Sequence, residues 1–257
     1  MNPESEQASH VGDALLGSRP ELRSGVLYLV PTPIGNLEDI TLRGIRTLRE
    51  ATRIACEDTR HTGRLLKALG VENRLLSLHA HNEERRAESL IEKLRAGESI
   101  ALVSDAGCPA ISDPGTRLVR RVLDAGFEVE GLPGPCAAIT ALIGSGIPTD
   151  EFHFFGFLPV KAGRRKRELE RMRELPTTLL LYESTYRIEK LLMELVAEFP
   201  NQPTIVAREL TKRHETYYRG RPNEVLDALR AGSTKGEFVV LIDNRPVKAD
   251  SDKVVEP

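Results

Sequence analysis

Residues 99–125 read SIALVSDAGCPAISDPGTRLVRRVLDA and contain a complete strand, loop and helix. The apolar run 99–104 predicts a buried strand, and the pattern of 115–125 predicts a helix that stops at Gly126. A strand that leads through one loop into a helix is the building unit of a parallel sheet. This stretch therefore indicates an α/β fold.

The connecting loop at 104–115 is made largely of small residues, glycine and proline, which let a ligand approach the backbone closely. Asp113 lies just before the helix and could cap it. Asp105 ends the strand, where no local structure needs a carboxylate, so it is the better candidate to meet a ligand.

The same alternation extends on both sides of this stretch. Further strands are expected at 26–31, 53–56, 75–79 and 128–132, with helical spacing around 40–48, 65–69 and 83–96. The resulting sheet is largely parallel, and ligands of such sheets lie beyond the carboxyl ends of the strands.

The second half of the chain has a mixed pattern. Strands are expected at 152–158, 177–184, 204–211, 215–219 and 237–243, and helices at 164–174, 187–199 and 222–231. Only residues 212–214 separate two of these strands, which predicts an antiparallel hairpin. We expect a loose leader at 1–24, α/β domains at 25–134 and 135–244, and a polar tail at 245–257.

Two further loops share the composition of the first. PTPIGN at 31–36 and LPGPCAA at 132–138 each follow a strand, and Gly35 permits an unusual backbone angle. Either could be a simple turn, but three such loops at strand ends predict one ligand crevice.

Charged residues gather in two other turns, CEDTRHTG at 56–63 and ARELTKRHE at 207–215. In the first, Thr59 could cap a helix with Glu57 and Asp58 near its positive end, or the polar side chains could bind a polar substrate. The second could be a solvated turn. Three of its side chains, Glu209, Thr211 and Glu215, fall on one parity and could share a face.

Basic residues concentrate between Lys161 and Arg173, interleaved with glutamates. This mixture fits a solvated helix with i,i+4 pairs, and it also fits an arm that contacts phosphates. Because the net charge is −2, RNA binding would depend on such local clusters.

Composition narrows the remaining possibilities. Three unpaired cysteines favour a reducing cytoplasm over a disulfide framework, and no apolar run has membrane-spanning length. His79 and His81 have strand spacing that could converge on a metal, but no third ligand is evident, so no metal site is expected.

The loops resemble those of the tetrapyrrole methylase superfamily, and within it the bacterial 16S ribosomal RNA cytidine 2′-O-methyltransferases. The matching motifs, spread over residues 27–243, are LYLVPTPIGNLEDITLR, EDTRHTGRLL, LHAHNE, ALVSDAGCPAISDPG, LPGPCAAITAL, FHFFGFLP, YESTYRI, ARELTKRHE and GEFVVLID. The sequence departs modestly from the family pattern at Pro31, Cys108 and Ala110.

The resemblance implies two α/β domains with mixed sheets, a cofactor cleft between them and no Rossmann-type site. It implies S-adenosyl-L-methionine as cofactor, a homodimer, and methylation of a decoding-centre cytidine ribose in the 16S rRNA of the small ribosomal subunit. The matching motifs place the cofactor near Pro33, Asp105, Cys108, Cys136, Ala137 and Tyr182.

A ribose hydroxyl is a weak nucleophile and benefits from a proton acceptor. The candidates are Glu57, Asp58 and His61 on one side of the cleft and Glu209 and Lys212 on the other. Expected substrate contacts are Arg60, Arg164, Arg165, Lys166 and Arg167. Two alternatives stay open: methylation of a tetrapyrrole or other small metabolite, and a non-catalytic RNA-binding assembly factor.

Overall fold

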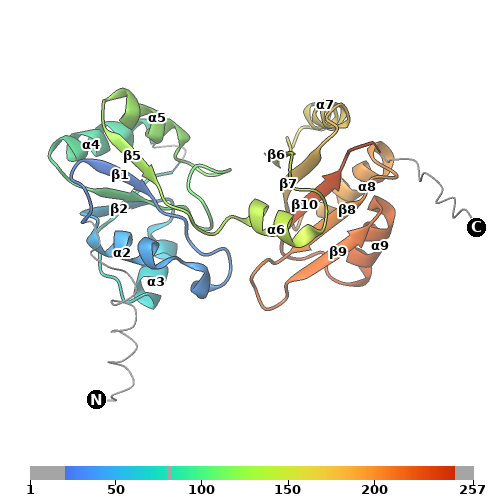
Figure 1. Ribbon diagram of the computed structural model, residues 1–257, viewed down its shortest axis with the longest axis horizontal. Helices are drawn as coiled ribbons and strands as arrows, with labels where there is room; N and C mark the ends of the chain where they lie inside the picture. Colours follow the sequence, from blue (N-terminus) through green and yellow to red (C-terminus); the bar gives the residue numbers. More distant parts are fainter. Residues whose placement is uncertain (1–20, 80–82, 247–257) are drawn as a thin grey trace, which may run out of the picture.

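The computed structural model describes residues 21–79 and 83–246, which form two five-stranded sheets flanked by helices (Figure 1). Most of the expected leader, most of the tail and His81 lie outside the described residues. Residues 21–24, which we assigned to the leader, contact the first sheet: the Arg23 amide donates to the Tyr28 hydroxyl at 2.8 Å.

The first sheet is entirely parallel, in the order β3 (Leu75–Ser77), β2 (Arg53–Cys56), β4 (Ile100–Leu102), β1 (Val26–Leu29) and β5 (Glu128–Gly131). Its helical segments are η1 (Leu37–Asp39), α2 (Leu42–Glu50), α3 (Thr59–Ala68), α4 (Glu83–Arg95) and α5 (Thr116–Asp124). One apolar core includes Leu48 of α2 and Leu66 of α3, and a second includes Leu90 of α4 and Leu118 of α5. Helices thus cover both faces, as a parallel sheet requires.

The second sheet is mixed, in the order β6 (Phe152–Phe157), β7 (Thr178–Ser184), β10 (Glu237–Asp243), β8 (Thr204–Arg208) and β9 (Thr216–Gly220). Only the β6–β7 pair is parallel, and β8–β9 is the antiparallel hairpin that the sequence predicted. Its helices are α6 (Ala137–Ser145), α7 (Ala162–Arg173), α8 (Ile188–Glu198) and α9 (Pro222–Ala231).

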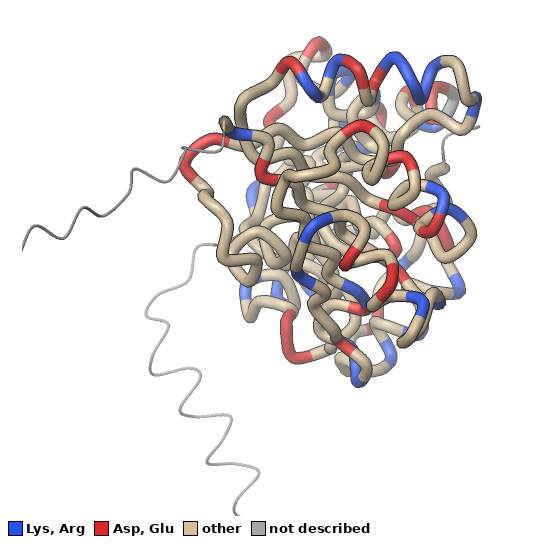
Figure 2. Tube along the Cα trace, turned by 90° about the vertical axis from the view of Figure 1, so that its right-hand side faces the viewer, with Lys and Arg blue, Asp and Glu red and all other residues tan. Residues whose placement is uncertain are grey.

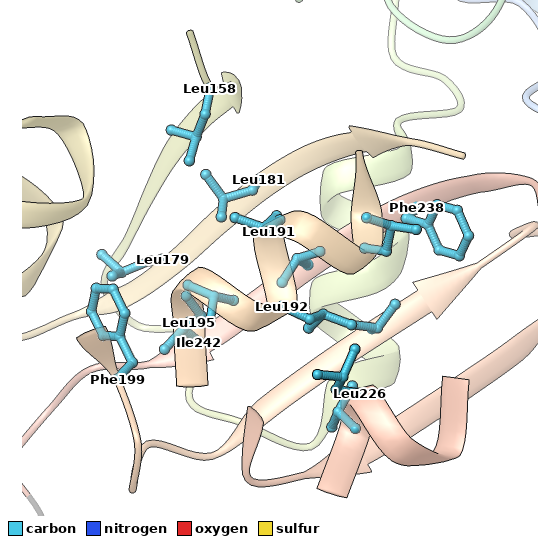
Figure 3. Close-up of a cluster of buried hydrophobic side chains, with 14 of the residues drawn as sticks. Leu158, Leu179, Leu181, Leu191, Leu192, Leu195, Phe199, Leu226, Phe238 and Ile242 are labelled. Atoms are coloured by element: carbon cyan, nitrogen blue, oxygen red, sulfur yellow. The ribbon is translucent and has the colours of Figure 1, made fainter. Parts of the chain in front are cut away.

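The central strands of this sheet are apolar on both faces because each face has its own core. Leucines of α8 and α9 pack with Leu181 and Val240 on one face (Figure 3). Ala141 of α6 packs with Leu180 and Leu241 on the other face. The chain passes from the first sheet to the second between Leu132 and α6, so α6 both follows the connection and covers the second sheet (Figure 1).

Within residues 21–79 and 83–246, every helix is too short or too polar to cross a bilayer. Over the same residues, no group of three or more His, Cys, Asp or Glu side chains could hold a metal ion.

Candidate functional site

The three loops at the strand ends of the first sheet lie against one another, which confirms that they form one constellation. Thr32 and Gly107 exchange two backbone hydrogen bonds of 3.0 Å, and the Thr32 hydroxyl donates to the Ser104 carbonyl at 3.1 Å. The third loop packs so closely that a Cβ atom on Gly134 would lie 2.7 Å from the Pro31 Cβ.

A cavity of about 390 Å³ lies at this edge and is closed on its other side by the second sheet. Its walls combine loops that follow β1, β2, β4 and β5 with the ends of β6, β7 and β10 and the turn after β8. The lining residues are Ile34, Glu57, 105–108, 111–113, Cys136, Ala137, Phe157, 182–184, Leu210, Lys212 and 237–239. A cavity of this volume can accommodate a molecule of the size of a cofactor.

The wall from the first sheet carries three carboxylates, Glu57, Asp105 and Asp113. Burial raises the pKa of Asp113 to about 6, with repulsion from Glu57 and Asp105 adding to it. Burial and repulsion from Asp105 also raise the pKa of Glu57. Within the described residues, no Lys or Arg forms an ion pair with any of the three.

Two helix caps differ from those expected. Asp58, and not Thr59, caps α3, because its carboxylate accepts the amides of Arg60 at 2.7 Å and His61 at 3.3 Å. These backbone hydrogen bonds lower the pKa of Asp58. Asp58 therefore has a structural role outside the cavity lining.

Asp113 does not cap α5, because the N-cap residue of that helix is Gly115, which has no side chain to accept a hydrogen bond. Instead, Glu83 of α4 accepts the amides of Gly115 at 3.1 Å and Leu118 at 3.0 Å. Asp113 is thereby left to line the cavity, a position that sequence reasoning missed because it assigned this residue to the helix.

A pair of thiols forms the base of the cavity where α6 begins. Cys108 donates to the Pro135 carbonyl at 3.3 Å and its side chain contacts that of Cys136, the N-cap residue of α6. The neighbouring Cys108 thiol is the main cause that lowers the pKa of Cys136 to about 6, and the polar start of α6 adds to it. The Tyr182 hydroxyl accepts the Ala138 amide at 3.1 Å, so β7 caps the helix in place of the thiol.

The wall from the second sheet holds Lys212 between two carboxylates. Its ammonium donates to Glu237 at 2.8 Å and Glu209 at 2.9 Å. Burial acts to lower the pKa of Lys212, but these hydrogen bonds outweigh it and the pKa is raised. Lys212 is therefore a cation and cannot accept a proton.

The turn that carries Lys212 does not continue the strand alternation. Glu209 and Thr211 both have left-handed backbone angles, with φ of 53° and 63°, so the expected shared face of Glu209, Thr211 and Glu215 does not form. Instead, the Glu215 carboxylate accepts the Thr211 amide at 2.5 Å. Gly35 reaches this turn from the other half, and a Cβ there would lie 2.8 Å from the Thr211 hydroxyl. Close approach, and not an unusual angle, is the reason for a glycine at 35.

The basic segment divides into buried and exposed residues. Arg165, which we expected to contact substrate, is only 2% exposed and pairs with Glu194 at 2.5 Å and Glu183 at 3.6 Å. Glu183 also pairs with Arg187 at 3.2 Å. Arg165 therefore anchors α7 to the back of the cavity wall. The other expected substrate contacts, Arg60, Arg164, Lys166 and Arg167, are exposed.

The structure brings most of the expected cofactor contacts together. Asp105, Cys108, Cys136, Ala137 and Tyr182 line the cavity, whereas Pro33 does not and its neighbour Ile34 does. Of the proton-acceptor candidates, Glu57 and Lys212 line it, while Asp58, His61 and Glu209 do not. Besides Asp113, the lining residues that sequence reasoning missed include Phe157, Ser184 and Glu237. The quoted family motifs contained all three, and only their position in the fold shows that they face the cavity.

This combination of two sheets and an intervening cavity matches a known class. A family model described as tetrapyrrole (corrin/porphyrin) methylases matches residues 26–226. The chain belongs to the tetrapyrrole methylase family, in the branch of the small-subunit ribosomal RNA methyltransferases.

Two relatives illustrate the branch. The chain is 47% identical over 237 residues to the ribosomal RNA small subunit methyltransferase I of Micromonospora olivasterospora, covering 91% of this chain and 76% of the relative. It is 47% identical over 229 residues to the protein of the same name from Escherichia coli O157:H7, covering 88% and 80%.

A solved structure shares the fold at lower identity. The uroporphyrin-III C-methyltransferase of Thermus thermophilus, in complex with S-adenosylhomocysteine, superposes with a TM-score of 0.59. The match is 21% identical and covers 85% of this chain and 97% of that one.

Proposed function

We propose that this protein transfers the methyl group of S-adenosyl-L-methionine to the ribose 2′-hydroxyl of a decoding-centre cytidine in 16S rRNA. The observation that carries the proposal is the cavity between the two sheets, in a chain that is 47% identical to ribosomal RNA small subunit methyltransferases I over most of its length. The products would be S-adenosylhomocysteine and a 2′-O-methylated nucleotide.

The donor set of the cavity fits this cofactor. Apolar side chains such as Ile34, Ala137 and Val239 would contact the adenosine. The carboxylates of the opposite wall favour a sulfonium cation because no Lys or Arg of the described residues forms an ion pair with them. When bound, the cofactor supplies an activated methyl group to an aligned nucleophile.

The acceptor hydroxyl must lose its proton as the new bond forms, and a positioned carboxylate can accept it. Asp113 and Glu57 are the candidates because both line the cavity, and the pKa of about 6 makes Asp113 anionic at neutral pH while it remains basic. Asp58 and His61 would have a structural role and would not accept the proton.

The proposal includes a homodimer in the cytoplasm that acts on the small ribosomal subunit. The outer face of α6 exposes Ile139 and Ile143, the latter to 75%, which supplies an apolar surface for a second copy.

The test is tritiated methyl transfer from S-adenosyl-L-methionine to small subunits that lack the modification, beside naked 16S rRNA and a no-RNA control. Alkali-resistant label in a single cytidine is the expected result. Absence of label, together with cofactor binding by calorimetry, would refute the RNA substrate and leave the small-molecule alternative. Absence of cofactor binding would refute the methyltransferase itself.

A further inference from the structure

Four large apolar side chains are exposed either in the lining or within three residues, along the chain, of the residues that line the cavity. Ile111 and Phe157 line it and are 44% and 52% exposed, and Val160 and Tyr186, which lie outside the lining, are 79% and 96% exposed. We call these four residues the apolar rim. A cluster of exposed apolar side chains beside a site marks a surface that contacts a partner.

Tyr186 projects from a turn that is held firmly in place. The turn follows β7, and the Arg187 amide donates to the Ser184 carbonyl at 3.0 Å. The Thr185 hydroxyl donates to the Gly236 carbonyl at 2.7 Å and accepts the Gly236 amide at the same distance. The ring of Tyr186 is therefore exposed although the backbone of its turn is fixed by hydrogen bonds.

The same turn is bound to the end of β6, where the rest of the rim lies. The Arg187 guanidinium donates to the Leu158 carbonyl at 2.5 Å, next to Phe157. The Phe157 ring packs edge-on against Tyr182, with 5.7 Å between centroids. The apolar rim is thus continuous with the wall proposed to hold the cofactor.

Unpaired cations follow the rim directly along the chain. Lys161, Arg164 and Arg167 are exposed, and none has an ion-pair partner within the described residues. Farther along α7, the cations do have partners, as the 2.9 Å pair of Arg171 with Glu168 illustrates. Cations at the start of a helix oppose its macrodipole, so helix stability does not explain Lys161 and Arg164.

Figure 1 shows α7 at the top of the half that contains the second sheet, above β6 and β7. Figure 2 shows Lys and Arg interspersed with Asp and Glu over this side of the molecule, without a broad basic face. A polyanion would therefore be recognised here by a local group of cations and not by the field of the whole surface.

We propose that the apolar rim receives an unpaired base of the RNA, with Tyr186 stacked on it, while Lys161, Arg164 and Arg167 contact flanking phosphates. This inference rests on the proposed function. When the ribose of a nucleotide enters a cavity, the base of that nucleotide must leave the helical stack. The unstacked base then needs a new stacking partner. Tyrosine supplies one at low entropic cost, and neighbouring cations supply the charge that the backbone requires.

The experiment compares full-length Tyr186→Ala, Tyr186→Phe and Leu123→Ala in methyl transfer to small subunits that lack the modification. Leu123 is a matched control, because it is an exposed apolar residue in the last turn of α5. We expect Tyr186→Ala to raise the KM for the subunit by about tenfold with kcat little changed. Tyr186→Phe retains the ring and should stay within about twofold of the parent.

A second arm tests the cations through salt dependence. The triple variant Lys161→Ala, Arg164→Ala, Arg167→Ala should flatten the dependence of KM on salt concentration. The matched triple variant Arg171→Ala, Arg173→Ala, Arg230→Ala removes equal charge from the same half of the protein, but from residues with acidic partners. We expect this control variant to change the dependence of KM on salt concentration less than the first triple variant does.

The affinity for S-adenosylhomocysteine, measured by calorimetry, separates this inference from a damaged cofactor site and should be unchanged in Tyr186→Ala. A KM equal to that of Leu123→Ala in an active enzyme overturns the inference and leaves the proposed function intact. A change in sedimentation without a change in KM also overturns it and assigns the rim to contact between copies of the chain. If the parent protein itself labels no RNA, the proposed function fails and the inference falls with it.

Discussion

The two walls of the cavity differ in whether their charged residues form ion pairs. On the wall from the first sheet, Glu57, Asp105 and Asp113 lie close together without a Lys or Arg ion pair among the described residues, and burial raises two of their pKa values. On the wall from the second sheet, Glu183 pairs with Arg165 and Arg187, and Lys212 bridges two glutamates.

The difference separates charges that hold the fold from charges that are available for chemistry. In a close pair of opposite charges, each charge stabilises the ionised form of its partner, so neither group readily gains or loses a proton near neutral pH. Uncompensated carboxylates cost stability, and such perturbed groups concentrate at functional sites. The comparison predicts which wall responds to mutation through activity and which through stability.

The largest effect is expected for Asp113→Asn. Loss of the proton acceptor should lower kcat by about 10²–10⁴-fold while S-adenosylhomocysteine still binds. The control is Asp58→Asn, because asparagine caps a helix as well as aspartate does. The parent rate should also fall as pH drops below about 6. Loss of turnover in Asp58→Asn with normal turnover in Asp113→Asn would reverse the assignment.

The paired wall should respond through stability. Arg165→Ala leaves the buried Glu183 and the partly exposed Glu194 without this partner, and we expect the free energy of unfolding to fall by about 3–5 kcal/mol. The neighbouring Arg164→Ala changes an exposed side chain and should stay within about 0.5 kcal/mol. Urea denaturation measures both, and equal losses would contradict the division of the basic segment.

The contact between the walls is tested by Gly35→Ala. A Cβ would lie 3.0 Å from the Leu210 carbonyl and closer still to Thr211, so this turn must shift. We expect a loss of about 1–3 kcal/mol together with weaker cofactor binding. Gly63→Ala is the matched control: its Cβ would lie 3.8 Å from the Leu75 Cδ1, an ordinary van der Waals contact, and the change inside α3 should raise stability by about 0.5–1 kcal/mol. If Gly35→Ala and Gly63→Ala changed the free energy of unfolding in the same direction, close approach of the Lys212 turn would not be the reason for a glycine at 35.

The smallest effect concerns pH. The pKa of Asp113 is higher in the folded protein than in the unfolded chain, so its ionisation destabilises the fold as pH rises through about 6. Asp113→Asn should therefore raise the melting temperature at pH 8, with a gain of at most about 1 kcal/mol because the group is half-exposed and solvent screens it. The gain should shrink as pH falls from 6 towards 4. A gain that grows on acidification would contradict the raised pKa.

Much of the architecture could be predicted from the sequence because it depends on local periodicity. The buried strand at 99–104, the strand at 128–132 and the helices between strands indicated a parallel sheet, and the parallel order then placed the loops at one edge. The hairpin after β8 followed from the short spacing between two strand patterns. Each of these features can be predicted from residues that are close together in the sequence.

The features that escaped prediction depend on contacts between residues far apart in the sequence. Asp113 has the position of a helix cap, but Glu83 reaches that helix from α4 and replaces it. Arg165 resembles its exposed neighbours in sequence, and only the packing of α7 against β7 and α8 buries it. The left-handed angles of Glu209 and Thr211 similarly broke the alternation assumed for a strand.

The double hydrogen bond between Thr32 and Gly107 has a consequence for the thermodynamics of binding. Two loops that would otherwise be free to move are joined to each other by main-chain atoms before any ligand arrives. The conformational entropy of these segments is therefore lost when the protein folds and not when a ligand enters. A ligand that fills the cavity then meets a surface already in its final shape, and its affinity is not reduced by the ordering of these loops.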